Sequence, residues 1–216
     1  MSVIRLYHCA DARSFRPLWA LEELGLEYEL TVMPFPPRVR QREYLEVNPL
    51  GTIPAMADGE TFMTESAAIV QYLVTRHGPS PLTVDPDDPA YGAWLNWLHF
   101  GEATLTFPQT LVLRYRRFEP GKAEVVADDY AKWFLARLRA VDRALQDTDW
   151  LCAGRFTAAD ISVGYALLLA AQLGLDAEFT PAIAAYWARL QARPGFQAAK
   201  ASQVRHAPEG AEAFPT

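Results

Sequence analysis

The spacing of hydrophobic and polar positions changes along the chain and divides it into two parts. In the first 78 residues, short apolar or alternating runs that predict strands are separated by runs with the spacing of amphipathic helices. This pattern predicts the order β-α-β-α-β-β-α. The elements are expected at residues 3–7, 15–24, 28–32, 43–47, 55–57, 61–63 and 67–76. Gly25 is expected to end the first helix, because glycine readily adopts the left-handed conformation of a helix C-terminus.

Prolines mark the boundary between the two parts. Four of them lie within residues 79–89, where they exclude a continuous helix, so residues 79–90 are predicted to be a linker. Helical spacing dominates from residue 91 to residue 216, and residues 158–173 are apolar nearly all round, as expected of a helix inside a bundle. The pattern therefore predicts an α/β domain over residues 1–78 and an all-α domain over residues 91–216.

A capping motif precedes the apolar helix. Thr157-Ala158-Ala159-Asp160 has the form [ST]-x-x-[DE], in which the first side chain and the last bond reciprocally to backbone N–H groups at a helix start. We interpret this motif as structural and assign it no chemistry.

Composition and charge exclude several classes of protein. Half of the 216 residues are apolar, the net charge is −6 and the pI is near 5.3, which argues against general nucleic-acid binding. No apolar run approaches the length of a membrane span, and the N-terminus reads as a strand rather than a signal peptide. The two cysteines and four histidines have no metal-ligand spacing, so we expect no metal. Cysteine usage suits a reducing, cytoplasmic compartment.

The segment from Asn48 to Ala55, followed by Glu65 and Ser66, carries the main chemical signal. Asn48-Pro49-Leu50-Gly51 predicts a turn, and Pro54 cannot donate to a β-ladder. The backbone of Ile53 could then pair with an extended ligand. Ser66 is expected to cap the next helix, whose N-terminus would attract a carboxylate, and Glu65 could hold an ammonium group. The segment therefore predicts a site for a small zwitterionic peptide.

This ordered combination resembles the glutathione site of the glutathione transferase superfamily, and the resemblance extends over almost the whole chain. It implies a thioredoxin-like N-terminal domain, a C-terminal helical bundle and a homodimer. It also implies that Ile53, Pro54, Glu65 and Ser66 bind glutathione. Arg13-Ser14-Phe15-Arg16 and the following Trp19–Leu24 segment resemble the serine-dependent bacterial and fungal branch, although Ala12 stands where that pattern has its first serine.

Three residues compete for the role of stabilising the glutathione thiolate. Ser14 directly precedes the first helix, so its hydroxyl and nearby N–H groups could face the sulfur, and it is our first choice. Tyr7 is the first rival, because some transferases have a catalytic tyrosine at the end of the first strand. Cys9 is the second rival and would act by forming a mixed disulfide, although the position of the thiol in cysteine-type members corresponds to Arg13.

Further residues complete the predicted site. Arg40, or Arg38 on the same loop, could hold the glycine carboxylate of glutathione. Phe107 and Tyr115, together with Tyr7, are expected to line a pocket for the electrophile between the domains.

The function that follows is conjugation of reduced glutathione to hydrophobic electrophiles, as in detoxification, by a cytoplasmic enzyme without nucleic-acid or membrane partners. A glutathione-dependent thiol oxidoreductase or peroxidase using Cys9, and a transferase-like binding protein without catalysis, are the alternatives. Lyase, dehalogenase or isomerase chemistry would use the same site.

Overall fold

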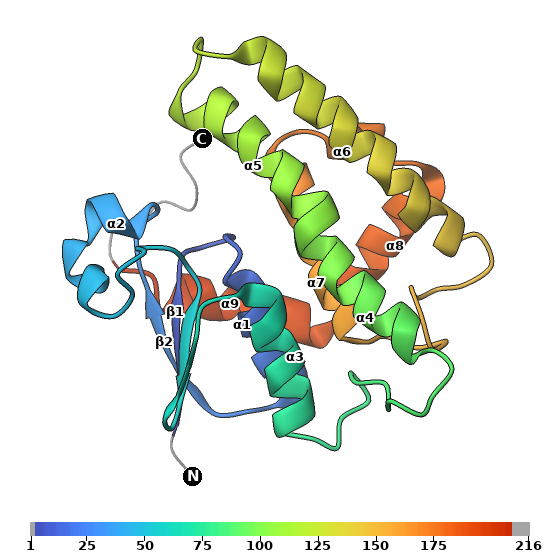
Figure 1. Ribbon diagram of the computed structural model, residues 1–216, viewed down its shortest axis with the longest axis horizontal. Helices are drawn as coiled ribbons and strands as arrows, with labels where there is room; N and C mark the ends of the chain where they lie inside the picture. Colours follow the sequence, from blue (N-terminus) through green and yellow to red (C-terminus); the bar gives the residue numbers. More distant parts are fainter. Residues whose placement is uncertain (1–2, 209–216) are drawn as a thin grey trace. The chain divides into compact units, whose positions relative to one another are not determined.

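The computed structural model describes residues 3–208 of the chain, which form two compact units. The first unit contains residues 3–80 together with residues 192–208, and the second runs from Pro81 to Gln191 (Figure 1). The chain therefore leaves the first unit at the linker and returns to it after the second unit is complete.

A four-stranded mixed sheet forms the base of the first unit. Its strands are β1 (Ile4–His8), β2 (Tyr28–Val32), β3 (Ala55–Asp58) and β4 (Thr61–Met63), in the order β2-β1-β3-β4. β1 is parallel to β2 and antiparallel to β3, and β3 is antiparallel to β4. The parallel pair is possible because α1 (Phe15–Leu24) carries the chain across between β1 and β2. This topology confirms the predicted thioredoxin-like domain.

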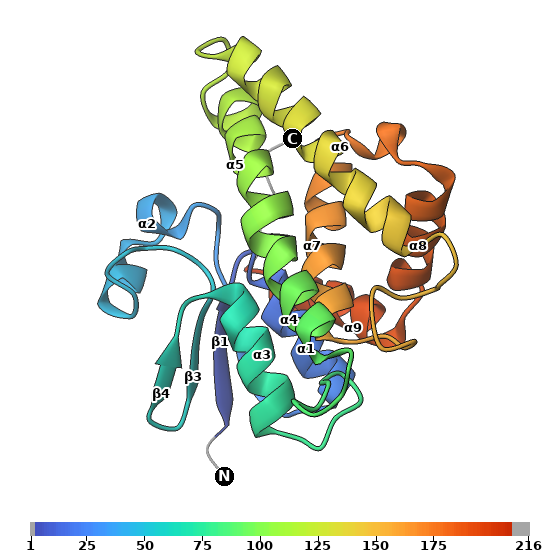
Figure 2. The same ribbon diagram turned by 45° about the vertical axis from the view of Figure 1, so that its right-hand side comes forward.

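Helices α1 and α3 (Ser66–Arg76) pack side by side in this unit (Figure 2). The first seven residues of α1 are buried, as the apolar spacing predicts. The helix ends at Gly25, which has a φ of 63° and donates its N–H to the carbonyl of Glu22. Between β2 and β3 the chain forms two short helical segments, α2 (Pro37–Arg40) and η1 (Arg42–Glu46).

The last described helix, α9 (Pro194–Arg205), belongs to the first unit and not to the helical one. Its helical spacing alone predicts that it belongs to the all-α domain at residues 91–216. In the structure the ring of Phe196 packs edge-on against Phe15 at 5.2 Å and against Trp19 at 5.0 Å. Arg193, one residue before the helix, makes two 2.7 Å bonds to Glu23. These contacts to α1 explain the difference.

The second unit is helical, as predicted. It contains α4 (Tyr91–Phe100), η2 (Gly101–Thr106), α5 (Phe107–Leu113), η3 (Arg114–Phe118), α6 (Glu124–Ala144), α7 (Ala158–Gln172), η4 (Asp176–Glu178) and α8 (Pro181–Gln191). Helix α7 is buried along its first thirteen residues, which agrees with its apolar sequence.

Two π-helical segments, η2 and η3, flank α5 and were not predicted. Side chains bond to carbonyl groups along the first of them: Thr106 donates to the carbonyl of Gly101 at 2.7 Å, and Gln109 donates to that of Leu105 at 3.0 Å. Gly101 touches α7 so closely that a Cβ atom there would lie 2.5 Å from the carbonyl carbon of Ser162. The π turn thus lies where the α4 helix makes backbone contact with α7.

The predicted capping box at the start of α7 is present. The N–H of Thr157 donates to Asp160 Oδ2 at 2.8 Å, and the Thr157 hydroxyl accepts the N–H of Ala159 at 3.3 Å. Asp160 Oδ1 also accepts from the N–H of Leu151 at 3.1 Å and from the Tyr186 hydroxyl at 2.8 Å. Burial raises the pKa of the Asp160 carboxyl to about 6. One carboxylate therefore joins α7, α8 and the preceding loop.

Within residues 3–208, none of the helices combines the length and the apolar character that crossing a membrane requires.

Candidate active site

The turn at residues 48–52 is held by the side chain of Asn48. Its amide donates to the Thr52 carbonyl at 2.8 Å, and its carbonyl oxygen accepts the N–H of Leu50 at 3.2 Å. Tyr44 donates its hydroxyl to the same Thr52 carbonyl at 2.7 Å. Gly51 has a φ of 60°, and a Cβ atom there would lie 2.5 Å from Cβ of Arg38, so the position requires glycine. The predicted turn is thus confirmed.

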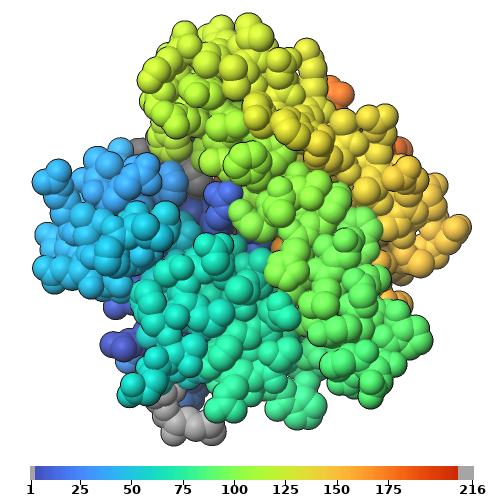
Figure 3. All heavy atoms as spheres, viewed as in Figure 1, coloured from blue at the N-terminus to red at the C-terminus, as the bar shows by residue number. Residues whose placement is uncertain are grey.

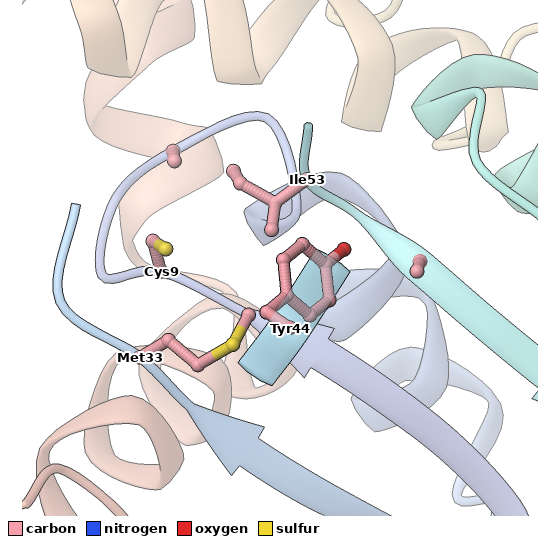
Figure 4. Packing of buried hydrophobic residues seen from close by; sticks show 6 residues of the cluster. Cys9, Met33, Tyr44 and Ile53 are labelled. Carbon is pink, nitrogen blue, oxygen red and sulfur yellow. The ribbon is translucent and has the colours of Figure 1, made fainter. Parts of the chain in front are cut away.

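Ile53 lies just outside the sheet. The pairing of β1 with β3 ends at Tyr7 and Ala55, and the intervening Ile53–Pro54 peptide bond is cis. The Ile53 side chain is buried in an apolar cluster, which Figure 4 shows from close by. The members of this cluster are Cys9, Ala12, Met33, Tyr44, Ile53 and Ala55, with Tyr7, Phe35 and Val47 packed against it. The side chain therefore anchors a backbone segment that precedes the paired strand.

The start of α3 differs by one residue from the prediction. Glu65, not Ser66, is the N-cap, because its backbone is extended and its carbonyl accepts the first helical bond, from Ile69 N–H at 2.8 Å. Ser66 is the first residue of the helix, and its hydroxyl accepts a 3.1 Å bond from Arg16 Nη1. Glu65 is exposed, whereas Ser66 is buried.

Arg16 contacts the predicted site residue Ser66, a contact that the sequence did not reveal. It lies in the first turn of α1 and is completely buried, so its charge must be held by hydrogen bonds. Because its guanidinium group bonds to Ser66, it adds positive charge at the N-terminal end of α3, where the helix dipole is also positive. In the sequence Arg16 appeared only within the Arg13-Ser14-Phe15-Arg16 segment, and its long-range partner gave no local signal.

Ser14 precedes α1 as predicted, but its hydroxyl faces the loop. The side chain is completely buried, accepts the N–H of Cys9 at 3.2 Å and donates to the carbonyl of Cys9 at 3.3 Å. It makes no side-chain capping bond to the helix. The Ser14 hydroxyl therefore closes the loop 9–14 on itself, and donation to a ligand sulfur would require the bond to the Cys9 carbonyl to be replaced.

Cys9 is completely buried beside this loop, and burial raises the pKa of its thiol to about 12. A mixed disulfide requires an accessible thiolate, so these surroundings disfavour the redox role that the sequence left open.

We expect Cys9 in the native protein to resist alkylation at neutral pH, and Cys9→Ala to keep its activity within about twofold, because an unionised buried thiol does not react. Peptide mapping after iodoacetamide treatment would separate Cys9 from the other buried thiol, Cys152. Labelling in denaturant is the control. Rapid native labelling of Cys9, or loss of turnover in the alanine variant, would restore the redox interpretation.

The remaining predicted residues lie in different parts of the chain. Tyr7 lies in β1 and stacks at a tilt on Tyr44, with ring centroids 5.6 Å apart. Arg40 ends α2 and is exposed, on a segment that reaches the surface in Figure 3 (light blue). Phe107 and Tyr115 both lie in the second unit; Phe107 is 54% exposed and Tyr115 is half-buried, with the Arg114 guanidinium 5.5 Å from its ring centroid.

The β2-β1-β3-β4 mixed sheet, with α1 crossing between its parallel strands, defines the first unit as a thioredoxin-like domain, and the second unit is helical. Two family models match the chain: the glutathione S-transferase N-terminal domain over residues 6–81, and the glutathione S-transferase C-terminal domain over residues 108–194. The chain belongs to the glutathione transferase superfamily.

Individual relatives agree with this assignment. Glutathione S-transferase 3 of Schizosaccharomyces pombe is 30% identical over 173 residues, which cover 73% of this chain and 70% of the relative. Glutathione S-transferase GstA of Escherichia coli O157:H7 is 29% identical over 203 residues, covering 93% and 98%. A solved sphingomonad glutathione S-transferase, complexed with glutathione, has a TM-score of 0.81 at 26% identity and covers 93% of this chain and 98% of its own.

Proposed function

We propose that this protein is a glutathione transferase that binds reduced glutathione in its first unit and joins the sulfur to a hydrophobic electrophile. The thiolate donates an electron pair to the electrophilic carbon. A sulfur–carbon bond forms. In a substitution, the bond from that carbon to the leaving group breaks and its electron pair goes with the leaving group; in an addition, the π electrons move away from that carbon and the adduct takes up a proton. The observation that carries this proposal is the placement of Ser66 at the start of α3 over the buried Arg16, in a chain of this family.

The γ-glutamyl end of glutathione fits the start of α3. Its α-carboxylate would accept from the Ser66 hydroxyl and from N–H groups of the first helical turn, where Arg16 and the helix dipole both favour negative charge. The exposed carboxylate of Glu65 would pair with the ammonium group. The α-carboxylate would therefore meet the positive charge of Arg16 and of the helix dipole, and the ammonium group would meet the negative charge of Glu65.

The middle and the glycine end fit the other predicted residues. The cysteinyl backbone of glutathione would pair with Ile53, which precedes the β1–β3 ladder, beside the fixed ring of Pro54. The glycine carboxylate would bind Arg40, whose exposed position at the end of α2 leaves it accessible. Within the first unit, the predicted contact of the electrophile is Tyr7.

Ser14 and Tyr7 remain the candidate donors to the sulfur. The buried, internally bonded hydroxyl of Ser14 supports a role in shaping the loop, and direct donation to the sulfur would require its bond to the Cys9 carbonyl to be replaced. The oxidoreductase alternative has less support because Cys9 is buried and unionised. We also propose a cytoplasmic homodimer, in keeping with the family.

Reduced glutathione should bind the protein with a thiol pKa clearly below the value of about 8.5 for a free thiol, because the site must favour the thiolate. The measurement is thiolate ultraviolet absorbance against pH in the wild type, Ser14→Ala and Tyr7→Phe. Restoration of the pKa in only one variant would identify the donor. Binding without a lowered pKa would favour a binding protein, and absence of binding would overturn the proposed function.

A further inference from the structure

We propose that Gln203 and Lys200 of α9 are positioning residues that fix the loop 9–14 in the form that stabilises the thiolate. This inference rests on the proposed function of that loop. It assigns a role to side chains that lie about 190 residues away in sequence from the loop, within the same structural unit.

Asp11 is the point at which α9 holds the loop. It has a φ of 54°, a left-handed conformation that is unfavourable for a non-glycine residue, so its surroundings must maintain it. Lys200 Nζ lies 2.7 and 2.8 Å from its two carboxylate oxygens. Gln203 Nε2 donates to Asp11 Oδ1 at 2.7 Å, and the N–H of Asp11 donates to Gln203 Oε1 at 3.1 Å. Gln203 thus holds both the backbone and the side chain of Asp11.

Gln203 also bonds to the end of β1. Because its Nε2 donates to a carboxylate, its Oε1 must be the acceptor for His8 Nε2, which lies 3.0 Å away. This bond requires the proton of His8 to be on Nε2. Burial lowers the pKa of His8 to about 4, so the ring is neutral at physiological pH. One buried amide therefore connects the last residue of the strand with the turn that follows it.

Hydrogen bonds within the short loop couple the position of Asp11 to that of Ser14. The N–H of Ala12 donates to the Cys9 carbonyl at 3.1 Å, and the Ser14 hydroxyl bonds to the N–H and carbonyl of Cys9. The N–H of Phe15 donates to the Ala12 carbonyl at 2.8 Å. Any movement of Asp11 must therefore change the position of Ser14 and the start of α1.

A second polar contact, made by the residue that directly precedes α9, supplies the control. The bidentate pair between Arg193 and Glu23 joins the beginning of α9 to α1 and involves no residue of the loop. Its loss should loosen the helix without removing a bond from Asp11. Arg193→Met thus separates a general effect on α9 from a specific effect on the loop.

The experiment compares wild type, Gln203→Leu, Lys200→Met and Arg193→Met by three measurements: thermal midpoint, the rate of Cys9 alkylation without glutathione, and the thiol pKa of bound glutathione with kcat and KM. We expect Gln203→Leu to accelerate Cys9 labelling and lower kcat by about tenfold or more, as loss of a buried hydrogen bond predicts. It should also raise the bound thiol pKa. Lys200→Met should act in the same direction.

Arg193→Met should lower the thermal midpoint while leaving the labelling rate, the thiol pKa and kcat near wild type. If Gln203→Leu matched Arg193→Met in these three quantities, α9 would be merely structural and the inference would be wrong. If the wild type bound no glutathione, the proposed function would fail by itself. Cys9 labelling would then still decide whether α9 fixes the loop, and equal rates in all variants would overturn that too.

Discussion

Asp160→Ala is expected to destabilise the helical unit by on the order of 4 kcal/mol, because it leaves several buried donors without an acceptor. The carboxylate accepts from two backbone N–H groups, of Leu151 and Thr157, and from the Tyr186 hydroxyl, and it is completely buried. Losing the capping box also exposes the first turn of α7 to fraying. Urea unfolding followed by circular dichroism would measure the change.

Asp147→Ala is the matched control, because Asp147 is exposed on the preceding loop and its loss should change the free energy of unfolding by less than about 0.5 kcal/mol. Equal effects of the two substitutions would mean that the Asp160 network does not support the unit. Asp160→Asn keeps the shape but turns an amide toward two of the donors, so it should fall between the two.

The pH dependence of stability offers a second measurement on the same residue. Burial raises the folded pKa of Asp160 from 3.8 to about 6, so the folded state binds the proton more tightly than the unfolded state does. The contribution of protonated Asp160 to the free energy of unfolding is therefore fully present below about pH 4 and is lost as the pH rises through 6. The stability advantage of wild type over Asp160→Asn should shrink across this window and stay constant above it. A constant advantage would contradict the raised pKa.

His8 changes the free energy of unfolding with pH in the opposite direction to Asp160. Its folded pKa is lowered from 6.5 to about 4, so its contribution is present above pH 6.5 and is lost as the pH falls toward 4. Wild type and Asp160→Asn share His8, and its effect cancels in their difference.

Gly101→Ala is expected to cost about 3 kcal/mol or more, because the new methyl group would meet the backbone of Ser162 as well as its hydroxyl. Its Cβ would lie 2.5 Å from the carbonyl carbon and Oγ of Ser162 and 2.6 Å from the carbonyl oxygen. Ser162 cannot easily withdraw, since its hydroxyl donates to the Leu98 carbonyl at 2.6 Å. Relief would require the α4–η2 helix to move away from α7. Chemical unfolding and the thermal midpoint would report the loss.

Gly92→Ala supplies the control within α4. Nothing lies within 4 Å of a Cβ atom at Gly92, and the position is exposed, so alanine should stabilise the protein by up to about 1 kcal/mol through its higher helix propensity. Opposite signs at the two glycines are the expected result. A Gly101→Ala variant as stable as wild type would show that the two helices tolerate a wider separation.

The sequence predicted those parts of the fold that depend on local patterns. The helix at 15–24 and its end at Gly25 follow from side-chain spacing and from the freedom of glycine, and the structure confirms both. The π segment η2 begins at Gly101, where the chain touches Ser162 of α7, and no local sequence pattern encodes that long-range contact. The unit to which α9 belongs depends on its aromatic and polar partners in α1, and helical spacing identifies a helix without identifying its neighbour.

The features of the candidate site also fall into those that local sequence predicts and those that depend on distant partners. The turn before Ile53 was predictable, because proline and glycine constrain the backbone wherever they occur. The N-cap of α3 was misplaced by one residue, since the hydroxyl of Ser66 serves the buried Arg16 and not the helix backbone. Gln203 gave no signal at all, because its partners His8 and Asp11 lie at the other end of the chain.

The position of α9 in the first unit also affects the order in which the chain can fold during its synthesis. A ribosome releases the chain from its N-terminus, so residues 81–191 emerge before Lys200 and Gln203 exist. Until then, Asp11 and His8 lack the bonds that α9 provides. The first unit therefore cannot complete these contacts until its last helix has been synthesised, although most of its residues are translated first.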